Sequence, residues 1–295
     1  MIKPSLLQAF LIARIAAVAL EASLGAAGVI RARYRLWDTL ASFAMRVGNV
    51  MVNIAMNGLM FAGLVAASHW KLAVIPTSAA WAWALLFVLD DFTYYWFHRI
   101  SHRCRFWWAA HVNHHSSREY NLSTAVRQPW TGVVVGTWMP WIWLAWLGFP
   151  PEMILAQQGF NLFYQFWLHT EAVRRLPRWV EYLLNTPSHH RVHHGSNPRY
   201  LDRNYAGVLM VWDRAFGTFE AECDDDRPDY GLVRNIETYN PLRIAFHEWL
   251  SMGHDLAQAR SLREVAGVVF GPPGWRADGQ GETTDAIRAA WATRA

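Results

Sequence analysis

The sequence contains very little cysteine. Only Cys104 and Cys223 among its 295 residues carry a thiol, and neither belongs to a CxxC pair. Two isolated cysteines cannot form a disulfide framework, and they offer no thiolate set for a structural zinc ion. The sequence therefore excludes a disulfide-rich secreted domain. The two thiols are expected to be reduced and to face the cytosol.

Charged residues are also scarce. They make up 17% of the chain, whereas they form about a quarter of an ordinary soluble domain. Hydrophobic residues reach 53%, and there are 18 tryptophans, a residue that favours membrane–water interfaces. This composition indicates an integral membrane protein. The net charge of +4 does not indicate nucleic-acid binding, because no basic patch carries interleaved aromatic residues.

Five apolar stretches approach the roughly 20 residues that an α-helix needs to cross a bilayer. They lie at 6–30, 43–68, 75–97, 130–149 and 152–170. The first is too long for a signal peptide and has no small-residue cleavage site, so we interpret it as a retained helix lying partly in the interface. The sequence predicts an all-α integral membrane protein with four to five transmembrane helices.

The distribution of arginine predicts the orientation. Arginines cluster at 31–46, 99–127 and 174–178, whereas the alternate connections contain only Lys71 and the segment 148–151. By the positive-inside rule, the arginine-rich connections and the C-terminus are cytoplasmic. The bacterial inner membrane and the endoplasmic reticulum both fit this topology. Turn signals after Arg174 predict a cytosolic, histidine-rich helical cap rather than another span.

Most of the 13 histidines lie in three short motifs: HRISH at 98–102, HVNHH at 111–115 and HHRVHH at 189–194. A single histidine, His169, lies between the second and third motifs. Helical spacing places His98 and His102 on one face, and it joins His189 or His190 to His193 or His194. A lone histidine is usually surface decoration or a pH sensor. Nine or ten at ligand spacing indicate a metal centre instead.

The ligand type limits the metal. Imidazole suits iron, copper, nickel and zinc, and a catalytic zinc ion uses only three protein ligands. Nine or ten candidates therefore predict two ions, each with an open coordination position. Copper and dizinc remain chemically possible. Two irons that activate O₂ beside a lipid give such a site an obvious purpose.

The three histidine motifs resemble those of the fatty acid hydroxylase/sterol desaturase superfamily of membrane di-iron oxygenases. Within this superfamily, segments such as DDFTYYWFHR and QFWLHTE resemble the alkylglycerol monooxygenase-like members most. The resemblance covers roughly residues 85–220. It implies membrane helices in 1–73, a catalytic domain in 74–220 and a cytosolic cap and tail in 221–295. Two positions depart from the family's pattern, Arg103 after the second histidine and Arg118 in SSR. The implied metal ligands are His98, His102, His111, His114, His115, His169, His190, His193 and His194, with His189 as a tenth ligand or an outer partner.

The implied activity is hydroxylation of an unactivated C–H bond in a lipid substrate. The sequence has no GxGxxG, haem-attachment CxxCH or iron–sulfur cysteine run, so the electrons must come from outside. The donor would be a reductase or ferredoxin-like partner, or a reduced pterin. Two alternatives stay open: a sterol or carotenoid desaturase or hydroxylase on the same scaffold, and a membrane metal transporter or sensor. Transporters hold ions near the bilayer midplane, whereas these histidines lie at the cytosolic rim.

Two carboxylates are candidate partners of the ligands. Asp91 shares a helix face with His98 and His102, and Glu171 follows His169 by two residues. A carboxylate that accepts the outer N–H of a ligating histidine fixes its tautomer and raises its basicity. The neighbouring aromatic residues are expected to include some that line an apolar slot for the lipid.

Overall fold

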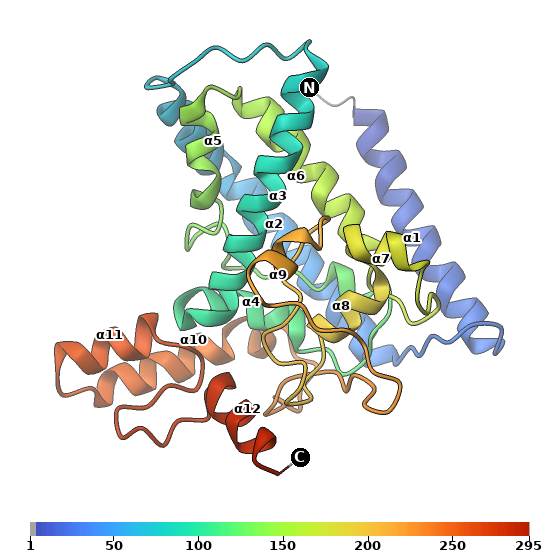
Figure 1. Ribbon diagram of the computed structural model, residues 1–295, viewed down its shortest axis with the longest axis vertical. Coiled ribbons are helices and arrows are strands. Elements are labelled where there is room, and N and C mark those ends of the chain that lie inside the picture. Colours follow the sequence, from blue (N-terminus) through green and yellow to red (C-terminus); the bar gives the residue numbers. More distant parts are fainter. Residues whose placement is uncertain (1–3, 295) are drawn as a thin grey trace.

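The structure is all-helical, as predicted. The computed structural model describes the backbone of residues 4–294 and the side chains of residues 11–56 and 58–294 (Figure 1). Within that range the only β pairing consists of two isolated bridges, Leu184–Leu209 and Gly195–Tyr230.

Four long helices form the upper part of the molecule in Figure 1. They are α1 (Pro4–Ala26), α2 (Leu36–Ser68), α3 (Ala80–Arg103) and α6 (Pro151–Phe166). The main apolar core joins α2, α3 and α6 with the short helix α5 (Ile142–Leu147), through buried residues such as Leu64, Leu86, Leu144 and Ile154. Burial of such side chains contributes about 1.5–3 kcal/mol each, which holds these helices together.

Four of the five apolar stretches form one helix each, but the stretch 130–149 does not. It folds into turns, a 3₁₀ turn η2 (Met139–Trp141) and the six-residue α5. Gly136 has a φ of +74°, a left-handed conformation that an α-helix cannot contain, and Pro140 lies in the 3₁₀ turn. The prediction of a single helix there was wrong. It relied on apolar composition, whereas Gly136 and Pro140 interrupt the helix.

Among the described residues, no single helix is both long and apolar enough to span a bilayer. One bent pair of helical segments meets these two criteria together, Leu36–Met56 with Gly58–Ser68, which are bent by 46°.

Smaller helices carry the chain across the lower end of the bundle (Figure 1). A break at Cys104 turns the chain from α3 into α4 (Arg105–His115), and Arg105 is buried. Its guanidinium binds Glu248 and Asp255, both at 2.6 Å, on α10 (Pro241–Gln258). This arginine therefore fixes the C-terminal part of the chain against α4. The other helices are η1 (Thr124–Val126), α7 (Arg178–Leu183), α8 (Pro187–His193), α9 (Val211–Ala215), α10 (Pro241–Gln258), α11 (Leu262–Phe270) and α12 (Thr284–Ala292).

Candidate metal centre

Nine buried or nearly buried histidines converge where α3, α4, α8 and the end of α6 meet. The first set, called here the five-histidine group, is His98, His102, His111, His115 and His193. The second, called the four-histidine group, is His114, His169, His190 and His194. Within each group the candidate ligand atoms all lie within 4.8 Å of one another.

Helical spacing explains how the groups are sorted. The pairs His98/His102 on α3 and His111/His115 on α4 each lie one turn apart and enter the five-histidine group. The corresponding pair at the end of α8 is His190 and His194, which enters the four-histidine group. The groups also touch each other, because the rings of His115 and His194 stack with centroids 4.3 Å apart.

Backbone carbonyls fix the tautomers of several rings. His114 Nδ1 lies 3.2 Å from the carbonyl oxygen of Arg127, and His169 Nδ1 lies 2.9 Å from that of Gln165. A carbonyl oxygen only accepts, so each Nδ1 must carry the proton. In a neutral ring the Nε2 atom is then left with its lone pair.

These lone pairs face one another. The Nε2 atoms of His114 and His169 are 3.1 Å apart, and His190 Nε2 lies 3.1 Å from the same His169 atom. Two hydrogen-bond acceptors at this distance repel unless a cation lies between them. The pKa of His114 is lowered to about 4, mainly by burial, so a proton is not that cation at neutral pH.

The five-histidine group shows the same pattern. His98 and His193 donate from Nδ1 to the carbonyl oxygens of Tyr205 and Arg203, at 2.9 and 3.0 Å. His98 Nε2 then faces His111 Nε2 at 3.0 Å. The Nε2 atoms of His102 and His193 are buried without a hydrogen-bond partner. The donor set of both groups therefore fits metal ions.

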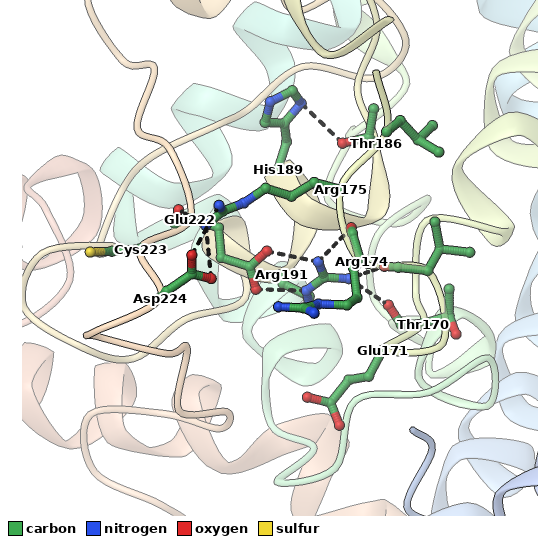
Figure 2. Close-up of polar contacts among 12 residues, drawn as sticks. Thr170, Glu171, Arg174, Arg175, Thr186, His189, Arg191, Glu222, Cys223 and Asp224 are labelled. Atoms are coloured by element: carbon green, nitrogen blue, oxygen red, sulfur yellow. Dashed lines mark hydrogen bonds and ion pairs between the residues drawn. The ribbon is translucent and has the colours of Figure 1, made fainter. Parts of the chain in front are cut away.

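His189 lies in neither group. Its ring is directed at Thr186, with Nδ1 3.4 Å from the hydroxyl, and at Glu181, 3.9 Å away (Figure 2). Burial lowers the pKa of His189 to about 4. The neighbouring Arg191 turns the other way and binds Glu222 with two hydrogen bonds, of 2.7 and 2.8 Å (Figure 2).

Arg191 also ties α8 to the chain that follows His169. It donates to the carbonyl oxygens of Thr170, Val173 and Arg174 at 2.7–3.0 Å (Figure 2). Because His169 and His190 enter the same group from different parts of the chain, this clamp fixes their relative position.

Asp91, predicted as an outer partner of a ligand, hydrogen-bonds a neighbouring segment of the chain. Its carboxylate accepts from the backbone N–H groups of Val208 and Leu209 and from the indole of Trp212, at 2.8–3.0 Å. Three donors from one loop satisfy it more fully than one imidazole would. Asp91 therefore acts through the loop whose Tyr205 carbonyl accepts from His98.

Glu171, the other predicted outer partner of a ligand, makes its contacts with two different side chains. It pairs with Arg31 at 3.2 Å and accepts from Tyr230 at 3.3 Å. Tyr230 stacks on Tyr120 at 4.8 Å, and Tyr120 stacks on His169 at 5.7 Å. Two aromatic rings thus separate the carboxylate from the group.

The carboxylate that approaches a ligand is Asp202, which sequence reasoning missed. Its Oδ1 lies 3.4 Å from His102 Nδ1. One hundred residues separate the two, so no helical spacing signals the pair. Asp202 and Asn204 both have a φ of +56°, a conformation that Asp and Asn tolerate better than other side chains, and Asn204 binds the carbonyl oxygens of His189 and Glu220.

Two buried carboxylates support the four-histidine group. Asp38 on α2 pairs with Arg127 at 2.6 Å, and Arg127, whose carbonyl accepts from His114, is fully buried. Glu21 on α1 accepts from the Leu122 N–H at 2.8 Å and from the hydroxyl of Thr170, the residue after His169. These contacts cross long sequence separations, and the sequence signalled only Glu21, an acid within the apolar stretch 6–30.

A cavity of about 1010 Å³ opens onto the five-histidine group. Its inner wall includes His102, His115 and His193, and its outer wall comes from the C-terminal segment, including Thr284 and Ile287. Charged residues are common in the lining, so this approach is polar. It differs from the expected apolar slot in its charged lining, although Trp108, one of the expected aromatic residues, does line it.

Residues 83–218 match the model of the fatty acid hydroxylase family. The alkylglycerol monooxygenase of Homo sapiens is 43% identical over 209 residues, which make up 70% of this chain and 45% of that protein. The alkylglycerol monooxygenase of Xenopus tropicalis is 38% identical over 242 residues, 82% of this chain and 53% of that protein.

A bacterial relative is more distant. Ornithine lipid hydroxylase OlsE of Rhizobium tropici is 25% identical over 149 residues, 50% of this chain and 45% of that protein. The chain spans about half the length of the curated relatives that it matches. No solved structure matches it. All nine converging histidines lie within residues 83–218, the segment of this chain that matches the fatty acid hydroxylase family.

Proposed function

We propose that the protein is a membrane-bound, non-haem di-iron monooxygenase that hydroxylates an unactivated C–H bond of a lipid. The facing Nε2 lone pairs of two adjacent histidine groups carry this proposal. Nine imidazoles exceed the three ligands of a catalytic zinc site, which favours two ions. Imidazole without thiolate suits iron among the available metals.

The printed names of the relatives support a lipid as the substrate. One set is named alkylglycerol monooxygenase and the other ornithine lipid hydroxylase, and both names describe oxygen insertion into a lipid. These names favour hydroxylation over the alternative of a sterol or carotenoid desaturase. The shared feature is a long alkyl chain attached to a polar head.

The bound irons would supply O₂ activation. One oxygen atom enters the C–H bond and the other leaves as water, and this reaction consumes two electrons and two protons. Nine histidines hold the two ions in our proposal: five in one group and four in the other. The carbonyl oxygens that accept from Nδ1 keep the Nε2 atoms of four rings aimed inward and unprotonated, those of His98, His114, His169 and His193. We propose His189, Asp91 and Glu171 as positioning residues, because each contacts the frame around the groups.

The electrons come from an external donor, either a reductase or ferredoxin-like protein or a reduced pterin. The polar cavity beside His102 and His193 gives a small, water-soluble molecule a route to the five-histidine group. In this proposal the long helices in 1–73 and 74–220 anchor the protein in a bacterial inner membrane or the endoplasmic reticulum. The histidine groups and the 221–295 cap then face the cytoplasm.

Turnover under ¹⁸O₂ tests the reaction. Membranes containing the protein, an alkylglycerol or acyl lipid and a reducing system should yield a hydroxylated lipid with one labelled oxygen, and the reaction should stop without air. A new double bond without label would favour the desaturase alternative. Label that came only from water would indicate metal-dependent hydrolysis and would refute the proposal.

A further inference from the structure

The outer partner of His102 differs in kind from those of His98 and His193. The latter two donate to backbone carbonyls, whereas His102 Nδ1 faces the Asp202 carboxylate at 3.4 Å. The opposite ring atom, His102 Nε2, is buried without a partner, and it belongs to the five-histidine group. A carboxylate in this place holds the proton on Nδ1 and makes Nε2 the stronger donor to a metal.

Asp202 is itself held by Arg103, the residue next to His102. Arg103 Nη1 lies 3.2 Å from Asp202 Oδ2. The same guanidinium makes two bonds to Asp285, Nη1 to Oδ1 at 2.9 Å and Nη2 to Oδ2 at 2.6 Å. One guanidinium therefore links a carboxylate beside the histidines to a carboxylate on the C-terminal helix.

That helix, α12, is docked against the same loop by a second contact. Arg288 donates to the carbonyl oxygens of Arg199 and Leu201, at 2.6 and 3.2 Å. Asp202 follows immediately, in the left-handed conformation that its neighbours must stabilise. The first turn of α12 also lines the cavity that opens onto His102. α12 thus supports the loop and closes the cavity at the same time.

We infer that α12 positions the metal ligand His102 through Asp285, Arg103 and Asp202. The inference rests on the proposed function in one respect, that His102 binds a metal ion. It assigns a role to residues 284–292, which lie outside the matched family segment 83–218. It also gives Arg103, one of the two departures from the family's pattern, a function in this chain.

The series of contacts from Asp285 through Arg103 and Asp202 to His102 is called here the relay. It predicts losses of metal affinity that differ in size between its two carboxylates. Asp202→Asn keeps the side-chain shape and tolerates the left-handed backbone, but it removes the charge. It should weaken Fe²⁺ binding at one of the two sites by about 10-fold or more, the usual effect of losing such a partner. Asp285 is 67% exposed, and exposed ion pairs are weak, so Asp285→Asn should weaken the same site by no more than about 5-fold.

A double variant distinguishes the relay from two independent structural effects of the single substitutions on metal affinity. If Asp285 acts through Asp202, then Asp285→Asn should add no further loss in a protein that already carries Asp202→Asn. The matched control is Glu237→Gln, because Arg118 binds Glu237 with two exposed hydrogen bonds of 3.0 and 3.1 Å in an ion pair outside the relay. This control should leave both sites unchanged.

The experiment is an anaerobic Fe²⁺ titration of the full-length protein in detergent against a competing chelator, with gel filtration to verify folding. We expect two tight irons in the unaltered protein, one in Asp202→Asn, and no additional loss in the double variant. Two equally tight irons in Asp202→Asn, equal weakening of both sites, or additive losses would overturn the relay alone. An unaltered protein that binds no iron would overturn the proposed function and the relay together.

Discussion

His114 and His169 face each other with their Nε2 atoms 3.1 Å apart, although both rings already donate from Nδ1 to backbone carbonyls. Neither atom can supply a proton to the other while both rings are neutral. The contact is favourable only with a cation between the two rings, so the geometry at this position fits a bound metal ion.

The two groups should lose metal independently. His169→Ala should remove the iron of the four-histidine group, and His193→Ala that of the five-histidine group, because each ring belongs to one group only. Each variant should bind its own metal at least about 10-fold more weakly, since losing a ligand costs no less than losing its outer partner. Iron analysis of purified protein measures this. His254→Gln is the control, because this exposed histidine lies in neither group. Retention of two irons in both alanine variants would contradict the assignment.

Acid should destabilise the metal-free protein within a defined window. Burial lowers the pKa of His114 from the usual 6.5 to about 4. The unfolded chain therefore binds the proton first, and stability is lost as pH falls from 6.5 to 4, with no further contribution below that range. This one group accounts for about 3 kcal/mol at most. Denaturant unfolding at several pH values measures the slope, which His114→Gln should reduce. A free energy of unfolding that rises on acidification would refute this account.

The buried pair of Asp38 and Arg127 should be costly to break from one side. Asp38→Asn leaves a fully buried guanidinium beside a neutral amide, so we expect a loss of about 3–5 kcal/mol. Replacing both residues, as Asp38→Asn with Arg127→Met, should cost less than the sum of the single changes. Thermal unfolding in detergent measures the three variants. Additive losses would mean that the two side chains stabilise the fold independently.

The orientation can be tested with exposed cysteines in a variant that lacks Cys104 and Cys223. Arginine asymmetry places Lys71 outside the membrane and Asp225 in the cytoplasm, and both residues are exposed. An impermeant thiol reagent should therefore label Lys71→Cys in intact cells and Asp225→Cys only after permeabilisation. The reverse pattern would place the histidine groups on the side without cytosolic electron donors.

The sequence by itself determined the all-helical fold and the candidate ligands. Helical periodicity is local, so residues one turn apart such as His98 and His102 must lie on one face wherever the helix goes. Long apolar runs predicted four of the helices for the same reason. The prediction of one helix over the run 130–149 was wrong, because apolar composition does not describe the positive φ at Gly136 or the 3₁₀ turn at Pro140.

Only the tertiary structure decided which side chains support those ligands. Asp91 has a helical register suited to His98, yet three donors from the 208–212 loop take its carboxylate. Asp202 has no local relation to His102, yet the fold brings the two within 3.4 Å. A buried polar group takes whichever partners best replace water, and those partners are set by packing between distant segments. The division of the histidines into two groups also depends on the tertiary fold, because the neighbours His114 and His115 enter different groups, as do His193 and His194.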